Sequence, residues 1–186
     1  MDAATRRKYL AFGGAAVLSL LADQLSKAWA RAELRGHPPL VVVADYFDLA
    51  YAENRGIAFS LLHDHAYTRL LVPVIGLAAL GVILLFVRRA PAGRTLLAAC
   101  LGLLAGGALG NIIDRVAFAA VTDFVVWKAP LDGSICRAIG WVMARFGAEL
   151  RYCQWATFNV ADAALLVGAA GLLLDARQGE ASGRPS

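Results

Sequence analysis

The chain has 186 residues, of which 59% are hydrophobic and only 17% are charged, and its mean hydropathy is +0.60. A soluble domain carries about 25% charged residues, so this composition predicts a membrane protein and excludes a disordered chain or a collagen-like fibre. Three cysteines are too few for a disulfide-rich scaffold. A net charge of +4 is, in a membrane protein, usually a topology signal, so we do not expect nucleic-acid binding.

Four apolar stretches are each long enough to cross a hydrocarbon core of about 30 Å as a helix. They lie at about residues 9–29, 70–87, 96–113 and 158–174. Inside lipid every backbone polar group must be paired within its own segment, which favours helices over strands. We therefore expect an all-α membrane protein, a single domain over residues 1–186 with four transmembrane helices.

The first stretch also resembles a cleavable signal peptide, with Ala28-Trp29-Ala30 as the cleavage site. Asp23, Gln24 and Lys27 interrupt the region just before that site. Removal of this span would also leave an odd number of helices, so we favour a first span that is retained.

Basic residues orient the four spans. Eight of the 18 lysines and arginines fall in three short segments that lie on one side of the membrane, namely Arg6, Arg7, Lys8, Arg88, Arg89, Arg94, Arg177 and Arg184. The positive-inside rule then predicts that both termini are cytoplasmic. The two long connections, residues 31–66 and 118–157, are expected on the outer face.

The two outer connections differ in pattern. Residues 41–51 are rich in β-branched and aromatic side chains and predict a small β-rich element, a pair of short strands. Residues 137–151 predict an amphipathic helix, because apolar and charged side chains fall on different faces. The apolar ones are Ile139, Val142, Met143, Phe146 and Leu150, and the charged ones are Arg137, Arg145 and Glu149. This helix lies either in the membrane interface or over the protein's own outer face. The tail, residues 178–186, is expected to be disordered.

Several polar residues fall where lipid makes them unfavourable, since an ionisable group at the bilayer centre costs at least about 2.5–3.5 kcal/mol. Asp23 and Lys27 have the i, i+4 spacing of a structural ion pair. The third span has a glycine at every fourth position, a ridge that allows close helix packing and continues to Asp114. Its glycines are Gly102, Gly106 and Gly110.

Under one topology, four carboxylates and three amides map to the outer membrane interface. They are Asp23, Asn54, Asn111, Asp114, Asp123, Asn159 and Asp162. The three histidines lie in an outer connection and the cysteines are scattered, so no Cys/His cluster exists and we do not expect zinc. No serine or cysteine nucleophile has a histidine at a recognisable spacing. This gathering of polar groups at one depth predicts a functional site.

Two neighbouring carboxyl groups share a proton, so one can act as a base while the other acts as an acid. Such a pair can activate water for amide hydrolysis without a metal. A proton or cation transporter would use the same aspartates, and a non-catalytic scaffold would use only the glycine ridge. Transporter sites usually lie near the bilayer midplane, whereas these residues lie toward one face, which favours hydrolysis. Spacing alone leaves open which two aspartates react.

Four motifs follow one another along the chain. They are Asp23-Gln24-x-x-Lys27, Asn54-x-Gly56-x-Ala58-Phe59-Ser60, Gly110-Asn111-x-x-Asp114-Arg115 leading to Val121-x-Asp123-Phe124, and Phe158-Asn159-x-Ala161-Asp162. In this order and over nearly the whole chain, they resemble the bacterial lipoprotein signal peptidases, or signal peptidase II. The resemblance implies an intramembrane aspartic endopeptidase. Such an enzyme removes the signal peptide from a prolipoprotein just before a cysteine that carries a diacylglyceryl group.

The resemblance also implies roles for single residues. Asp123 and Asp162 would be the catalytic pair, while Asp23 and Lys27 would help hold the fold. The residues that would bind substrate or support the pair are Asn54, Gly56, Asn111, Asp114, Arg115 and Asn159. Neither a metal nor a cofactor is implied. The implied location is the bacterial cytoplasmic (inner) membrane with the site facing the periplasm, and the implied partners are prolipoproteins, membrane lipids and globomycin-type antibiotics.

One segment departs from the family pattern. Asp123 and Asp162 are separated by 38 residues, more than we expect for the family, and residues 128–155 look inserted. This insertion contains the amphipathic segment and two cysteines, Cys136 and Cys153. Because both would face an oxidising compartment, we expect them to form a disulfide.

Overall fold

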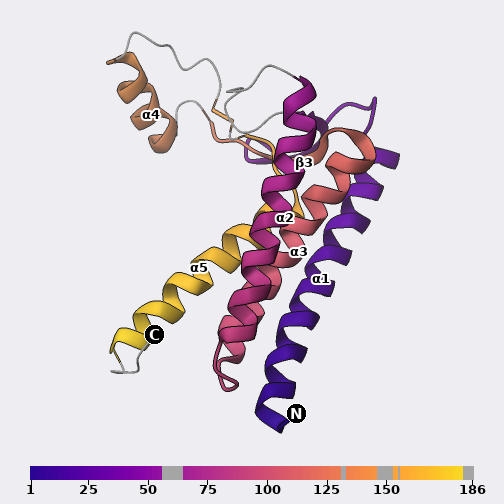
Figure 1. Cartoon of the computed structure of the whole chain (residues 1–186). Helices are drawn as coiled ribbons and strands as arrows, with labels where there is room; N and C mark the ends of the chain where they lie inside the picture. Colours follow the sequence, from indigo (N-terminus) through magenta and orange to yellow (C-terminus); the bar gives the residue numbers. More distant parts are fainter. Residues whose placement is uncertain (56–64, 131–132, 146–152, 155, 182–186) are drawn as a thin grey trace. The chain divides into compact units, whose positions relative to one another are not determined.

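The computed structural model describes residues 1–55, 65–130, 133–145, 153–154 and 156–181 (Figure 1). Its helices are α1 (Ala3–Glu33), α2 (His65–Arg89), α3 (Thr95–Phe118), α4 (Ser134–Ala144) and α5 (Val160–Ala181). Its strands are β1 (Leu40–Val43), β2 (Phe47–Asn54) and β3 (Val121–Trp127). The chain forms two compact units. Unit 1 is Met1–Ser26, Glu53–Val121 and Val160–Ser186, and unit 2 is Lys27–Ala52 and Thr122–Asn159.

Three of the described helices are long and apolar enough to cross a membrane. They are Ala3–Glu33, Leu71–Arg89 within α2, and Thr95–Phe118. These contain, or nearly contain, the first three expected spans, and the largely helical architecture is confirmed. The fourth expected span coincides with α5, which carries Asp162 near its start and Asp175 and Arg177 near its end. A crossing by α5 therefore stays a prediction.

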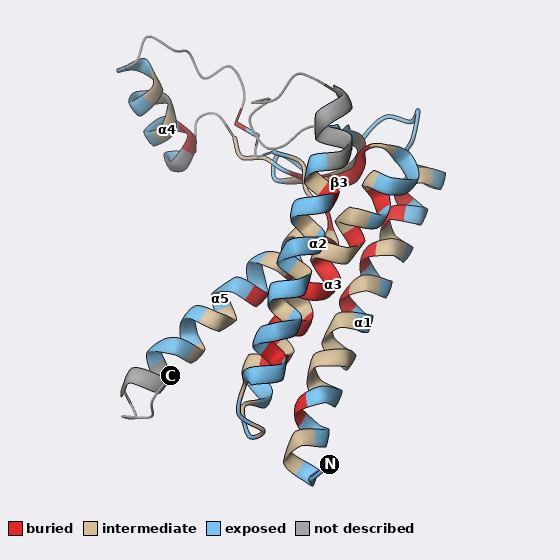
Figure 2. Ribbon diagram, in the orientation of Figure 1, coloured by how far each residue is buried: buried red, intermediate tan, exposed pale blue. Residues whose placement is uncertain are grey.

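In unit 1, α3 packs against α1, α2 and α5, and its buried positions run along the helix (Figure 2). A methyl group added at Gly102 would overlap the Phe12 carbonyl oxygen, and one added at Gly106 would overlap Ser19 of α1. Lipid tails are as apolar as the side chains, so helix association in a membrane depends on such close packing. The glycine ridge predicted from the sequence is therefore the surface on which α1 and α3 meet.

Polar contacts tie the helices of unit 1 together at the end that holds the α2–α3 connection. The Lys8 ammonium is buried and donates to the Ala90 carbonyl at 2.7 Å. Lys8 is one of the basic residues from which the orientation is predicted. Arg94, just before α3, forms an ion pair with Asp175 of α5. Asp2 accepts the Thr5 N–H at 2.7 Å, and hydrogen bonds from the side chain and then the backbone of Thr5 lower the pKa of the Asp2 carboxyl. The Lys8 and Arg94 contacts thus join the start of α1 and the end of α5 to the connection between α2 and α3.

Unit 2 is built around a three-stranded sheet with the order β1-β2-β3. β1 and β2 are antiparallel, with Leu40 opposite Leu49 and an irregularity between Val41 and Val43. The turn between them places Asp45 in the left-handed region, at φ 64°. The expected strand pair is confirmed, and the third strand, β3, is an addition that the sequence pattern did not predict.

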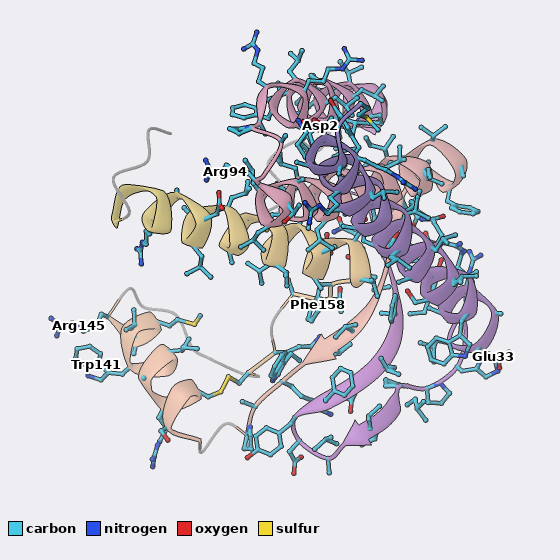
Figure 3. All side chains as sticks on the ribbon, turned by 90° about the horizontal axis from the view of Figure 1, so that it is seen from below. Asp2, Glu33, Arg94, Trp141, Arg145 and Phe158 are labelled. Carbon is cyan, nitrogen blue, oxygen red and sulfur yellow. A yellow bond between two sulfur atoms is a disulfide. The ribbon has the colours of Figure 1, made fainter. Side chains whose placement is uncertain are left out.

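The insertion folds back on β3. Backbone bridges pair Val125 with Phe158 and Lys128 with Gln154. The predicted disulfide is present, joining Cys136 of α4 to Cys153 with Cα atoms 5.9 Å apart (Figure 3).

Helix bounds in two segments differ from expectation. α4 begins at Ser134 rather than near residue 137, and the remainder of the expected helix, residues 146–151, lies outside the described residues. The expected disordered tail began at residue 178, but α5 continues to Ala181, and only residues 182–186 lie outside the described part.

Candidate active site

Asp23 of α1 lies at the point where α1, α3 and α5 meet within unit 1, and its side chain is fully buried. Its Oδ1 atom accepts the Ala161 N–H at 2.8 Å. Ala161 is the second residue of α5, so this is one of the N–H groups that have no partner within the helix. Asp23 thus does for α5 what an N-cap side chain normally does, from another helix.

Gly110 of α3 makes this arrangement possible, because a Cβ at this position would overlap the Asp23 carboxylate. Gln24 reinforces the contact. Its Nε2 atom donates to Asp23 Oδ2 at 3.0 Å and to the Gly110 carbonyl at 3.2 Å, and lies 3.5 Å from Asp114 Oδ1. Asp114 is also fully buried. Gln24 stands in the first motif, but no pattern in the sequence predicted a role for it.

Asp162, in the first turn of α5, receives a hydrogen bond from α3. Asn111 Nδ2 donates to Asp162 Oδ1 at 2.9 Å. Arg115, one turn further along α3, donates to the Asn111 carbonyl at 3.2 Å. An amide that donates to a carboxylate fixes the orientation of that carboxylate. One predicted supporting residue, Asn111, therefore contacts a predicted catalytic residue, and a second, Arg115, contacts Asn111.

Asp123 has an equivalent arrangement within unit 2. It lies on β3 with an exposed fraction of only 1%, and Asn159 Nδ2 donates to its Oδ1 atom at 2.7 Å. Asn159 is held in place by the neighbouring Phe158. The Phe158 backbone carbonyl accepts hydrogen bonds from the Phe124 and Val125 N–H groups. The Phe158 N–H donates to the Val125 carbonyl at 3.1 Å. The buried carboxylate and its amide partner thus come from paired backbone segments.

A further contact lies beside Asp123. Arg31, in the last turn of α1, donates to the Thr122 hydroxyl at 2.9 Å, and Thr122 is buried. Neither residue was predicted from the sequence. The available signal was the position of Arg31 four residues after Lys27, which continues the same helix face beyond the expected end of the first span.

The remaining predicted site residues have different surroundings. Lys27 is fully buried in unit 2, whereas Asn54 is exposed at the end of β2. Gly56 lies outside the described residues. In the part of the chain that is described, no group of three or more histidine, cysteine, aspartate or glutamate side chains is arranged to hold a metal ion.

This geometry gives two buried or half-buried carboxylates, each oriented by an asparagine amide. Comparison with known proteins adds the decisive observation, because the family model for signal peptidase (SPase) II matches residues 15–177. The chain belongs to the signal peptidase II family. The family is one of aspartic peptidases, so the chain is an enzyme that hydrolyses peptide bonds. The resemblance predicted from the four motifs is confirmed.

Curated relatives agree with membership of the signal peptidase II family. The lipoprotein signal peptidase of Pseudomonas aeruginosa (strain UCBPP-PA14) is 35% identical over 168 residues, covering 90% of this chain and 88% of its own. That of Chlorobium luteolum is 36% identical over 167 residues, covering 88% and 89%. That of Geobacter sulfurreducens is 34% identical over 169 residues, covering 90% and 91%.

A solved structure described as a bacterial membrane enzyme has the same fold. It is 20% identical, aligns with a TM-score of 0.70, and covers 92% of this chain and 90% of its own. A second bacterial membrane enzyme, 21% identical, aligns with a TM-score of 0.66 over 87% of this chain and 88% of its own. Of the three functions that the residues left open, family membership favours hydrolysis over transport or a scaffold.

Proposed function

We propose that this chain removes the signal peptide from lipoprotein precursors, with Asp123 and Asp162 as its catalytic pair. The substrate class is supported by the family and by its relatives, which carry the name lipoprotein signal peptidase at 34–36% identity over about 90% of the chain. The diacylglyceryl-modified cysteine as the recognition point comes from the resemblance of the four motifs.

The observation that carries the catalytic assignment is the hydrogen bond from Asn159 to Asp123 at 2.7 Å. Asn159 immediately precedes α5, and Asp162 follows it by three residues, within the first turn. The short segment 159–162 therefore bonds to one carboxylate and carries the other. Asp23 accepts the Ala161 N–H of the same segment, which supports the start of α5 while the Asn159 amide donates to Asp123.

The proposed reaction needs one ionised and one protonated carboxyl group, which is the state favoured by two neighbouring aspartates. The ionised group takes a proton from water as the water oxygen attacks the carbonyl carbon of the scissile bond. The protonated group gives its proton to the carbonyl oxygen, which produces a tetrahedral intermediate. Collapse of the intermediate restores the carbonyl, breaks the C–N bond and transfers a proton to the leaving amine.

In this proposal, Asn111 and Asn159 hold one oxygen of each carboxylate by hydrogen bonds. A fixed orientation matters because a small misplacement of a reacting group costs a large factor in rate. Arg115 supports Asn111 from the same helix. Asp114 is assigned to support of the catalytic pair, and Asn54 and Gly56 are assigned to substrate contact.

The topology is part of the same proposal. It has four spans including α5, both termini in the cytoplasm, and the catalytic pair toward the outer face of the cytoplasmic (inner) membrane. The basic residues of the short segments support this orientation. Membrane lipids and globomycin-type peptides, which mimic the substrate, are the further partners that it assigns.

The test uses purified protein and a synthetic precursor that carries a diacylglyceryl cysteine. Asp123→Asn and Asp162→Asn are each expected to reduce the cleavage rate at least about a hundredfold, because each removes an acid–base group. Asp45→Asn, an exposed aspartate in a left-handed turn that asparagine also tolerates, is the matched control and should retain full activity.

Thermal unfolding of the variants checks that the fold is retained. Wild-type cleavage by either Asp123→Asn or Asp162→Asn would exclude that residue from the catalytic pair. Equal cleavage of a precursor that lacks the diacylglyceryl group would contradict the substrate assignment without affecting the catalytic one.

A further inference from the structure

The helix α4 has two contrasting faces within unit 2. Cys136 is buried with an exposed fraction of 1%, and Ile139 and Met143, which follow it on the same face, are half-buried. The opposite face carries Arg137 and Trp141, and both are exposed. The face that points away from the unit is therefore cationic and aromatic.

Arg137, Trp141 and Arg145 follow one another at four-residue spacing, and we call these three residues the arginine–tryptophan stripe. The Arg145 guanidinium lies over the Trp141 ring, 5.8 Å from its centroid. Figure 3 shows the labelled side chains of Trp141 and Arg145 on the side of α4 away from the disulfide. Trp141 has an exposed fraction of 69%, and its neighbour Val142 has 49%.

The disulfide sets which face of α4 is exposed. Cys136 is bonded to Cys153, and the next residue, Gln154, pairs with Lys128 at the end of β3. Ala129 adds a backbone hydrogen bond to the Cys153 carbonyl at 2.9 Å. These bonds fasten the Cys136 face toward β3, so the stripe is held outward without having to be ordered by a partner.

The charge of this segment is complementary to an anionic surface. Residues 128–155 hold four basic and two acidic residues, a net charge of +2, and no carboxylate falls within α4. Arginine binds phosphate through two parallel N–H groups, and tryptophan prefers the boundary between headgroups and acyl chains. An exposed tryptophan between two arginines matches both parts of that boundary.

We infer that α4 docks through the arginine–tryptophan stripe on the anionic phospholipid surface of the membrane in which the enzyme is embedded. The helices long enough to cross a membrane tether α4 to the same bilayer through the chain itself, so even a weak contact has a high effective concentration. An acidic protein would satisfy the arginines, but it would leave the exposed Trp141 and Val142 without an apolar environment. This inference does not depend on the assignment of Asp123 and Asp162.

The test places the full chain in nanodiscs of phosphatidylcholine, with or without phosphatidylglycerol. Brominated acyl chains quench nearby tryptophan emission, and the signal of Trp141 is obtained by subtracting the emission of Trp141→Phe. Trp141 should be quenched in the discs that contain phosphatidylglycerol and much less in phosphatidylcholine alone. High salt should relieve the quenching, because it screens the arginines.

The double variant Arg137→Gln, Arg145→Gln removes the charges but retains helix-forming side chains. Each interfacial arginine raises the ratio of docked to free α4 roughly fivefold. Removal of both charges should therefore lower this ratio about thirtyfold. Arg35→Gln is the matched control. It removes another exposed arginine of unit 2, which lies over the Tyr51 ring at 5.4 Å, and should leave the quenching of Trp141 unchanged.

Two results would overturn the inference. The first is an unquenched Trp141, or quenching that is equal in the two lipids. The second concerns the KM for the precursor. If the double variant raises this KM equally in both kinds of disc, the partner of the stripe is the precursor and not the lipid. Neither result would change the cleavage chemistry, because the stripe contains no proposed catalytic residue.

Discussion

Asn111 and Asn159 place side-chain amides against Asp162 and Asp123, at 2.9 and 2.7 Å. A hydrogen bond to a charged group contributes about 1.5–3 kcal/mol. If these bonds orient the catalytic carboxylates, their loss lowers the rate of the chemical step more than the affinity for substrate, because both partners belong to the protein.

We expect Asn159→Ala to lower kcat roughly tenfold to a hundredfold, with KM changed by less than about twofold. Steady-state cleavage of a lipid-modified precursor measures both constants. Gln154→Ala is the control, since Gln154 is an exposed side chain on the same returning segment. A raised KM with an unchanged kcat would instead place Asn159 in substrate binding.

Asp23 illustrates a structural role for a buried charge. Its carboxylate accepts the Ala161 N–H and the Gln24 amide, and its approach to α3 depends on Gly110. We expect Asp23→Leu to lower the free energy of unfolding by about 1–3 kcal/mol, because the N–H of Ala161 loses its acceptor. Asp23→Asn keeps an oxygen acceptor and should lose less.

Thermal unfolding in detergent distinguishes the two Asp23 variants. Equal destabilisation by Asp23→Asn and Asp23→Leu would show that the charge, and not the hydrogen bond to α5, is what matters at this position.

At the scale of elements, the contact between α1 and α3 depends on small residues. Gly106 lies against the Ala16 carbonyl and Ser19. Among the described residues, no atom outside the adjacent residues and the backbone of α2 itself lies within 4 Å of the position where a Cβ of Gly81 would be. We expect Gly106→Ala to destabilise the protein by about 1–3 kcal/mol, the usual cost of overpacking. Gly81→Ala should be neutral or slightly stabilising, because alanine has the higher helix propensity.

The comparison of these two glycines is made by unfolding midpoint. A Gly106→Ala protein as stable as the Gly81→Ala protein would mean that α1 and α3 do not pack through the ridge.

The sequence predicted most of these elements, and the element it missed has a physical explanation. Five of the seven residues of β3 are fully buried and one more is half-buried, so its sequence is a nearly continuous apolar run interrupted by Thr122 and Asp123. Without a solvent-facing side there is no alternation of polar and apolar residues to indicate a strand. By contrast, the β-branched and aromatic residues of β1 and β2 predict these two strands.

The candidate site was predictable to a similar extent. Residue type and expected depth grouped the seven polar residues in the prediction, but they did not predict which of them are hydrogen-bonded to one another. The bond between Asn159 and Asp123 depends on the backbone bridge between Phe158 and Val125 across the insertion, and a pairing over that distance leaves no periodic signal. Likewise, Gln24 and Arg31 act through contacts with α3 and β3 that no local pattern encodes.

At the scale of the whole molecule, the four motifs are distributed over both compact units. Asp23, Asn111, Asp114 and Asp162 belong to unit 1, whereas Asp123, the second aspartate of the proposed catalytic pair, belongs to unit 2. The membrane-spanning helices and the sheet must therefore cooperate in any active enzyme that uses both carboxylates.

The orientation proposed for the chain in the membrane can be tested directly. With Cys100→Ala as background, single cysteines at Ala44, Gly93, Ala156 and Ser186 report the side of the membrane on which each connection or terminus lies. The positive-inside rule predicts that a membrane-impermeant thiol reagent labels Ala44→Cys and Ala156→Cys in intact spheroplasts. Gly93→Cys and Ser186→Cys should react only after permeabilisation. Labelling of Ser186→Cys from outside would mean that α5 does not cross, because Ala156 and the C-terminus would then share one side, and the protein would have three spans.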